Sequence, residues 1–199
     1  AICTMDCGEY NNIHPVDKRT PGERLGNCAL HQVYGMSRIP VYGPTVLGFR
    51  CDEGGRVRLF FRYAHGLHFS GTTPDSYGDK FDKSLPSLVR LPECSGFELA
   101  GADGVFHPAT AAIFVDCDID DLINAKVNVV DYNATEFGIP INSRSIGTIT
   151  LATPEVPAPV MMRYAWRSWG PAPLANDNDL PAHPFKLDLT DHTDSDRAE

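Results

Sequence analysis

His14 is the residue of this sequence whose type and position are best suited to proton-transfer chemistry. It lies in the segment 11–15 (Asn-Asn-Ile-His-Pro), after a short apolar segment and before a predicted helix. In an α/β fold, a loop that joins a strand to a helix lies at the carboxyl end of the strand, where active sites form. An imidazole there can take the proton of a nucleophile and later protonate the leaving group. His14 is therefore the candidate general base and acid.

The partners that such a histidine needs are less well defined by the sequence. Asp6 and Glu9 are the nearest carboxylates that could orient the imidazole, but either could equally be a solvated loop residue. A backbone carbonyl, or the amide of Asn11 or Asn12, is an alternative. No serine stands in a recognisable nucleophile motif; polar turns hold Ser37, Ser70, Ser76 and Ser95. The sequence therefore indicates the histidine-bearing part of an active site without its nucleophile.

Composition excludes several classes of function. The chain has 199 residues, of which 42% are hydrophobic, so it can form a core of ordinary size. The formal net charge of -9 argues against nucleic-acid binding, which depends on clustered Lys and Arg. No run of apolar residues is long enough to predict a transmembrane helix, and no signal peptide is visible. The sequence leaves the compartment undetermined.

The first third of the chain predicts a strand, a loop and a helix. Residues 1–6 are interpreted as a short buried strand. Thr20 and Glu23 have the spacing of a capping box, Pro21 suits the first helical position, and Gly35 is a stop signal. Apolar residues recur between them at helical spacing, at Leu25, Cys28, Ala29 and Val33. These signals predict a helix over 21–34 with an apolar face built to pack on strands.

The rest of the chain predicts an antiparallel β-sandwich. Alternating or apolar segments predict strands at 45–51, 56–64, 97–100, 105–106, 111–115, 125–132, 148–152 and 160–166. Turn signals at 52–55 and 101–104 join neighbouring strands as hairpins. The segment 72–92 is interpreted as a polar surface loop. Several short strands with turns between them, and no convincing helix, are typical of a sandwich.

Other residues with chemical potential are interpreted as structural. His65 and His68 could begin a zinc site, but no third ligand has suitable spacing, so surface or packing roles are favoured. The cluster at 116–121 lacks the glycine and glutamate of a calcium loop and is interpreted as solvated. Trp166 and Trp169 could stack on a sugar ring, although core packing of a terminal strand against an α/β domain is favoured. No metal site is predicted.

The six cysteines form no Cys-x-x-Cys pair. They lie at Cys3, Cys7, Cys28, Cys51, Cys94 and Cys117. Such scattered positions argue against a zinc ribbon or a redox motif. Buried free thiols are favoured over one or two disulfides.

Three blocks of the sequence resemble the sialate O-acetylesterases, which are SGNH (GDSL-like) carbohydrate esterases. The first lies within 13–35 and begins Ile-His-Pro-Val-Asp-Lys. The second, at 96–109, begins Gly-Phe-Glu-Leu-Ala-Gly-Ala-Asp-Gly, and the third, Pro-Ala-Pro-Val-Met-Met-Arg-Tyr-Ala-Trp at 157–166, continues to 180–185. The blocks follow the family order over nearly the whole chain. In the family an Asp often stands two or three residues before the histidine, where this chain has Asn12 and Asn11.

The resemblance implies an α+β fragment. Residues 1–36 would be the C-terminal strand, histidine loop and helix of an SGNH (flavodoxin-like) α/β hydrolase domain. Residues 37–188 would form the β-sandwich, with an insertion at 116–147, and 189–199 an acidic flexible tail.

The resemblance also implies a function, the removal of acetyl esters from sialic acids or plant-polysaccharide sugars by a Ser-His mechanism. His14 would be the catalytic histidine, and a serine-bearing N-terminal portion would be the partner. No cofactor or metal would be needed, and the chain alone is predicted to be inactive. The alternatives are a non-catalytic sandwich that binds glycans or a protein partner, and a truncated product without function.

Overall fold

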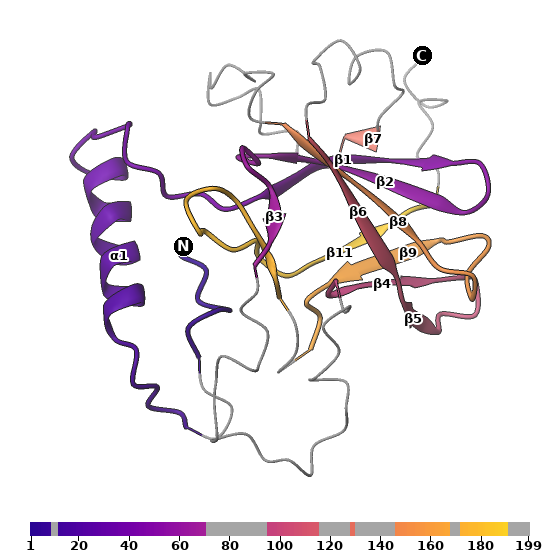
Figure 1. The fold of residues 1–199 in the computed structure, drawn as a ribbon, viewed down its shortest axis with the longest axis horizontal. Helices are drawn as coiled ribbons and strands as arrows, with labels where there is room; N and C mark the ends of the chain where they lie inside the picture. The colour runs from indigo at the N-terminus through magenta and orange to yellow at the C-terminus, as the bar shows by residue number, and fades with distance from the viewer. Residues whose placement is uncertain (9–11, 71–94, 116–127, 130–145, 168–171, 191–199) are drawn as a thin grey trace, which may run out of the picture.

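The structure is a computed structural model that describes residues 1–8, 12–70, 95–115, 128–129, 146–167 and 172–190. One helix, α1 (Arg19–Gln32), stands beside a set of antiparallel strands, and the N-terminal segment runs between the helix and the sheets (Figure 1). This is a β-rich α+β arrangement, as the sequence predicted in coarse terms. Within the described ranges, no helix has the length and apolar character needed to cross a membrane.

The larger sheet has five strands in the order β6-β8-β2-β1-β7, and all neighbours are antiparallel. Its strands are β1 (Thr45–Asp52), β2 (Arg56–Arg62), β6 (Thr110–Val115), β7 (Asn128–Val129) and β8 (Gly147–Ala152). The predicted hairpin at 52–55 is confirmed, since Asp52 pairs with Arg56 across the turn. Gly54 and Gly55 have φ angles of 76° and 74°, a backbone region that suits glycine.

A four-stranded sheet in the order β11-β9-β4-β5 forms the second layer, and a two-stranded sheet pairs β10 with β3. The strands are β3 (His68–Phe69), β4 (Phe97–Ala100), β5 (Phe106–Pro108), β9 (Met161–Tyr164), β10 (Leu174–Ala175) and β11 (Phe185–Asp188). The sequence predicted β4, β5 and β9 but missed β3, β10 and β11. The predicted loop at 72–92, and most of the predicted insertion and of the strand at 125–132, lie outside the described residues.

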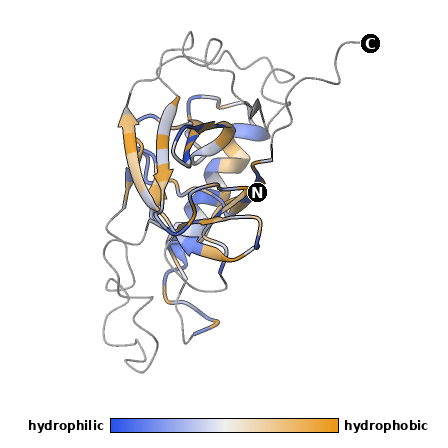
Figure 2. Cartoon of the chain, turned by 90° about the vertical axis from the view of Figure 1, so that its right-hand side faces the viewer, coloured by the Kyte–Doolittle hydropathy of each residue, from blue (hydrophilic) through white to orange (hydrophobic). Residues whose placement is uncertain are grey.

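The two larger sheets share one hydrophobic core, as a sandwich requires. Phe61 of the five-stranded sheet meets Phe185 of the four-stranded sheet with ring centroids 6.0 Å apart. Tyr164 is fully buried and lies against Phe97, 4.6 Å between ring centroids, and its hydroxyl accepts the backbone N–H of Leu174 at 2.8 Å. Figure 2 shows hydrophobic residues running along the strands, whereas α1 carries both hydrophilic and hydrophobic residues.

The packed region extends to Leu189. This residue was predicted to begin the flexible tail, but its side chain is buried and its backbone N–H donates to Val160 O at 2.8 Å. The division of the chain into domains remains a prediction.

Helix α1 begins two residues earlier than predicted, and the capping box is not formed. Lys18 is the N-cap residue and makes no side-chain capping bond; the carboxylate of Asp17 accepts the Thr20 N–H at 3.0 Å instead. Glu23 is bonded to Arg19 at 2.6 Å, so it does not reach back to the N-terminus. Thr20 lies inside the first turn of the helix and does not cap it. The carboxylate of Asp17, three residues earlier, accepts a backbone N–H of that turn in its place.

The strand predicted at residues 1–6 is absent. The segment makes a turn, with the Cys7 N–H bonded to Thr4 O at 3.3 Å, and only Cys3 in it is buried. A single apolar segment becomes a strand only where a neighbour pairs with its backbone. No described strand lies beside this segment. Instead, the side chain of Arg24 on α1 donates a hydrogen bond to the Cys3 carbonyl.

An acidic side chain of β4 is buried in the four-stranded sheet. Glu98 has only 8% of its side chain exposed, and its two carboxylate oxygens accept from Arg163 and Arg167 at 2.7 Å each. Burial opposes the ionised form, but the two guanidinium hydrogen bonds outweigh it and hold the pKa of Glu98 below its usual value.

Because the folded-state pKa of Glu98 is lowered, its stabilising contribution is present at neutral pH and is lost as the pH falls below the unfolded value of 4.5. We expect Glu98→Gln to lower the free energy of unfolding at pH 7 by about 1–3 kcal/mol, because two guanidinium groups lose their counter-charge. Urea unfolding at pH 7 and at pH 3 checks this. A wild-type-to-variant difference that is unchanged at pH 3 would contradict it.

Candidate functional site

His14 lies in the loop that leads into α1, and its side chain is exposed. Its backbone N–H donates to Asn12 Oδ1 at 2.9 Å, so the Asn12 side chain closes a local turn that shapes the loop. Ile13 beside it is 91% exposed, and Val16 is exposed as well. The imidazole is thus accessible, on a loop whose apolar side chains have no cover from the described residues.

The carboxylate that would orient His14 remains unassigned. Asp6 is engaged elsewhere, in a two-pronged ion pair with Arg24, and Asn12 acts on the backbone of His14. Glu9 and Asn11 lie outside the described residues. In the part of the chain that the structure describes, no carboxylate forms an ion pair with the His14 ring.

Arg24 of α1 joins three segments that are distant in the sequence. Its two terminal nitrogens donate to the two oxygens of Asp6 at 2.6 and 2.7 Å. The same nitrogens reach Cys3 O at 2.7 Å and Asp179 O at 3.1 Å. The planar fork of a guanidinium suits such paired contacts, which a lysine could not reproduce. Arg24 therefore fixes both the N-terminal segment and the turn at 176–181 against the helix.

The turn at 176–181 is held by the buried side chain of Asn176. Its amide nitrogen donates to Tyr42 O and Tyr63 O at 2.9 and 3.0 Å, and its oxygen accepts the N–H groups of Asn178 and Leu180 at 3.1 and 3.2 Å. These four hydrogen bonds use the full capacity of the amide. These bonds hold the backbone of the turn in a single conformation, in which Asp179 has a positive φ of 53°.

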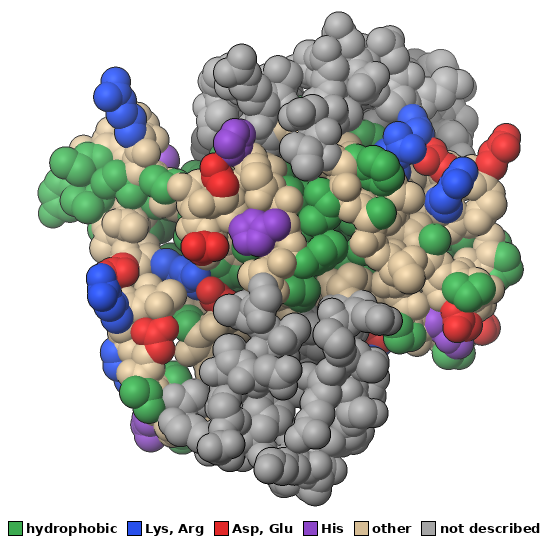
Figure 3. Space-filling view, in the orientation of Figure 1, with side chains coloured by type: hydrophobic (Ala, Val, Ile, Leu, Met, Phe, Trp, Pro, Cys, Tyr) green, Lys and Arg blue, Asp and Glu red, His purple; other side chains and the backbone are tan. Residues whose placement is uncertain are grey.

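A groove of about 490 Å³ with polar and apolar lining opens between α1 and this turn. One stripe of the helix lines it, at the spacing i, i+3, i+4 and i+7, formed by Thr20, Glu23, Arg24 and Asn27. The opposite wall comes from the turn and from β3–β10, through Ser70, Ala175, Asn178, Asp179, Leu180 and Pro181, and Asp6 completes the lining. Figure 3 shows acidic, basic and histidine side chains gathered between the helix and the sheets.

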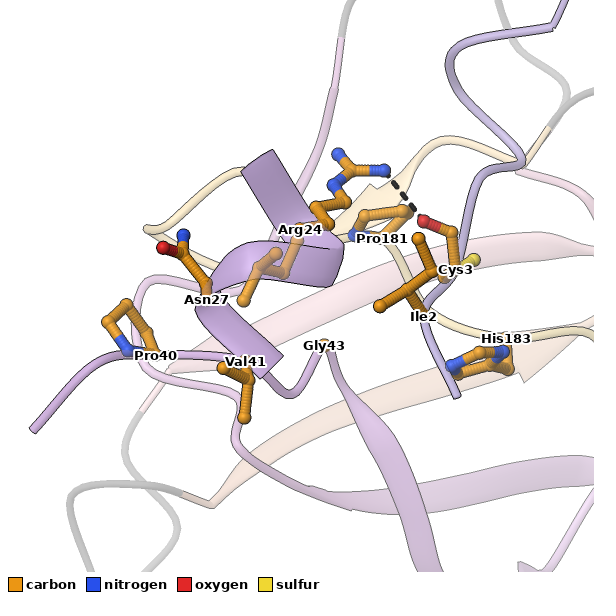
Figure 4. A pocket seen from close by; sticks show the side chains of 10 residues that line it. Ile2, Cys3, Arg24, Asn27, Pro40, Val41, Gly43, Pro181 and His183 are labelled. Carbon is orange, nitrogen blue, oxygen red and sulfur yellow. Dashed lines mark hydrogen bonds between the residues drawn. The ribbon is translucent and has the colours of Figure 1, made fainter. Parts of the chain in front are cut away.

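A second cavity, also lined by Arg24, is too small for a sugar. It measures about 20 Å³, which accommodates about one water molecule. Figure 4 shows Arg24 pointing to the Cys3 carbonyl at its edge. A side chain at Gly43 could not fit there, because a Cβ would lie 2.1 Å from Pro181 O.

The histidines of the β3 region lie beside carboxylates of the turn at 176–181. His65 Nδ1 lies 2.6 Å from Asp177 Oδ2, and His68 Nε2 lies 3.8 Å from Asp179 Oδ1. Among the described residues, no group of three or more His, Cys, Asp or Glu could hold a metal ion. The acidic cluster at 116–121 lies outside the described residues.

Trp166 follows β9 and is 49% exposed, so the described residues of this chain do not bury it, and its packing against the α/β domain stays a prediction. Trp169 lies outside the described residues. The cysteines agree with the favoured interpretation in part, since Cys3, Cys7, Cys28 and Cys51 are free, but only Cys3 is buried. Cys94 and Cys117 lie outside the described residues.

Comparison with known proteins points to a carbohydrate acetylesterase. No family model matches this chain, and no curated protein matches it. Among solved structures, it is similar to XAC1771, described as a novel carbohydrate acetylesterase from Xanthomonas citri, with a TM-score of 0.62 and 26% sequence identity. The similarity covers 94% of this chain and 32% of XAC1771, so this chain spans about a third of that protein's length. It supports a relationship to carbohydrate esterases.

The Arg24 contacts predict a specific loss on substitution. Arg24→Lys keeps the charge but cannot bind Asp6, Cys3 O and Asp179 O together, so we expect it to lower the free energy of unfolding by about 1–3 kcal/mol. Backbone hydrogen exchange in residues 3–7 and in α1 should accelerate while the core strand β9 is unaffected. Arg19→Lys, at an exposed ion pair on the same helix, is the control. Equal effects of the two variants would contradict the assigned role.

Proposed function

We propose that this chain is the histidine-bearing C-terminal portion of a carbohydrate O-acetylesterase of the SGNH type, similar to the sialate O-acetylesterases, with the nucleophilic serine in a portion outside this chain. The observation that carries the proposal is the structural similarity to a carbohydrate acetylesterase over 94% of this chain. The sequence block around His14 and the exposed position of the imidazole support the same function.

In the proposed reaction His14 moves protons while the serine forms and breaks bonds. The serine hydroxyl attacks the acetyl carbonyl as His14 accepts its proton, and the imidazolium then protonates the sugar oxygen as the ester bond breaks. Water attacks the acetyl-serine with His14 again as base, which releases acetate and restores the serine. Donors in the serine-bearing portion would stabilise the oxyanion. The chain alone is therefore expected not to hydrolyse acetyl esters.

The side of α1 that faces away from the groove supports the proposal that a further part of the protein packs on this helix. Its residues are small or apolar, namely Gly22, Leu25, Gly26, Ala29 and Val33. Leu25 is 59% exposed and Val33 is 76% exposed, and no residue of α1 is buried. A Cβ added at Gly22 or Gly26 would meet no atom within 4 Å. Exposed apolar surface of this kind marks an interaction site.

Hydrophobic residues continue beyond the helix. Tyr34 and Met36 are exposed in the segment that follows α1, and Figure 3 shows hydrophobic side chains protruding at that end of the molecule. The glycines would let another helix or a strand approach the α1 backbone closely. We infer that the serine-bearing portion packs on this face, because that would place its nucleophile beside the loop that carries His14.

The role of His14 is tested in the protein that contains both portions. We expect His14→Ala to lower kcat for deacetylation of an acetylated sugar by about 10³-fold or more, because the serine loses its base. Circular dichroism should be unchanged, since the side chain is exposed. His107→Ala, on β5, is the matched control and should retain turnover. Near-wild-type turnover of His14→Ala would sink the assignment and favour the non-catalytic binding module.

The outer face of α1 is tested by adding side chains to it. In the chain alone, α1 should exchange its amide hydrogens much faster than β9, and Gly26→Ala should stabilise the helix by about 1 kcal/mol. Joining the serine-bearing portion, covalently or in trans, should protect α1. Gly26→Leu should be tolerated by the chain alone but should weaken that protection, because its side chain would fill the space the partner needs. Full protection of α1 in the monomeric chain alone would contradict the inferred interface.

A further inference from the structure

The described edge strands of the two larger sheets differ in how they are protected against pairing with another chain. An edge exposes unpaired backbone N–H and C=O groups, and proteins shield it with charged residues, prolines or short strands. The four-stranded sheet ends at β5, which has three residues and includes Pro108, and at β11, which carries Lys186 and Asp188. The five-stranded sheet ends at β7, which has two residues, and at β6. Of these four described edges, only β6 lacks such protection.

The β6 strand is regular and uncharged along its whole length. Its sequence, Thr-Ala-Ala-Ile-Phe-Val, contains no charged residue and no proline. All six residues pair with β8 without a shift of register, so no bulge turns the strand away from a neighbour (Figure 1). In the part of the chain that the structure describes, no strand pairs with its other side, to which alternate N–H and C=O groups point. An open edge of this kind is a site for strand pairing.

The side chains of β6 are incompletely covered on both faces of the sheet. On the outer face Phe114 is 56% exposed, and Ala112 is exposed as well. On the inner face Ala111 and Ile113 lie opposite buried residues of β8 and contact the hydrophobic core, but they are only half-buried. A further strand beside β6 would therefore bury apolar surface on both faces and would also pair with the open backbone groups.

The sequence of β6 is complementary to itself. In an antiparallel pair about a two-fold axis, opposite residues share a face of the sheet. With Ala112 on the axis, Phe114 lies opposite Thr110 of the second copy, and Ile113 lies opposite Ala111. Each large side chain then meets a small one. The chain carries a net charge of -9, so two copies repel each other over most of their surfaces, but this uncharged edge brings no like charges together.

We propose that two copies of this protein pair through antiparallel β6 strands, which joins their five-stranded sheets into one continuous sheet. A six-residue strand is about 20 Å long, and one such pair buries less than the roughly 1,200 Å² of a stable interface. The dimer is therefore weak, with an expected Kd of about 10–100 µM. Because β6 lies away from α1 (Figure 1), this pairing leaves the outer face of the helix open for the serine-bearing portion.

The test is sedimentation equilibrium of this chain from about 5 to 500 µM, over which the wild type should pass from monomer to dimer. We expect Ala112→Lys to raise the Kd at least about tenfold, because two ammonium groups would face each other at the axis. Ala112 is exposed in the monomer, so circular dichroism should be unchanged. Ala102→Lys adds the same charge in the exposed turn between β4 and β5, and this matched control should dimerise as the wild type does.

The register is tested by NMR on a mixture of ¹³C-labelled and unlabelled chain. An intermolecular NOE between the Phe114 ring and the Thr110 methyl group is expected, and a dimer without it would contradict the proposed pairing. A chain that stays monomeric at every concentration, or a dimer that Ala112→Lys leaves intact, would overturn the proposal. If joining the serine-bearing portion abolishes the dimer, that portion occupies the β6 edge in place of a second copy, and the proposal fails.

Discussion

The contacts of one guanidinium, that of Arg24, tie helix α1 to two distant parts of the chain, while His31 and Gln32 contact Tyr42 at the other end of the helix. Helix α1 buries none of its residues, so packing of an apolar stripe, the usual source of helix stability in a folded domain, contributes little here. The Arg24 side chain instead connects the helix to Asp6, to the Cys3 carbonyl and to the Asp179 carbonyl. These hydrogen bonds hold the N-terminal segment and the turn at 176–181 against the helix, and so hold the two walls of the groove together.

A helix held through its polar stripe must present its other side outward. In α1 that side is made of glycine, alanine, leucine and valine, and its large residues are exposed. Burying such a surface would stabilise an interface by roughly 25 cal/mol per Å². The proposed serine-bearing portion would cover this surface, and the chain matches about a third of the length of the acetylesterase to which it is similar. The proposed function and the unusual orientation of the helix thus have one physical explanation.

The sandwich supplies the rigid half of the groove. Its core runs through both large sheets, and Tyr164 links that core to β10 through its hydroxyl. The β10 strand leads directly into Asn176, whose four hydrogen bonds shape the turn that carries Asp179. Tyr42 and Tyr63, whose carbonyls receive two of those bonds, stack with ring centroids 4.7 Å apart. The turn that forms one wall of the groove is therefore positioned by buried contacts rather than by a free loop.

The sequence by itself determined the features that depend on neighbouring residues. The 52–55 hairpin, the strands β1, β2, β4 and β8, and the existence of α1 follow from glycine, alternation and helical spacing within a few residues. The position of His14 before a helix was likewise visible.

Only the tertiary structure decided the rest. The N-terminal segment is not a strand because nothing pairs with it, and Asp17 replaces the predicted cap because the turn before α1 brings its carboxylate to the Thr20 N–H. The strands β3 and β10 have two residues each and exist through mutual pairing. The groove joins residues 155 positions apart, Arg24 and Asp179. Contacts at such separation leave no periodic signal in a sequence, because they depend on how complete elements pack.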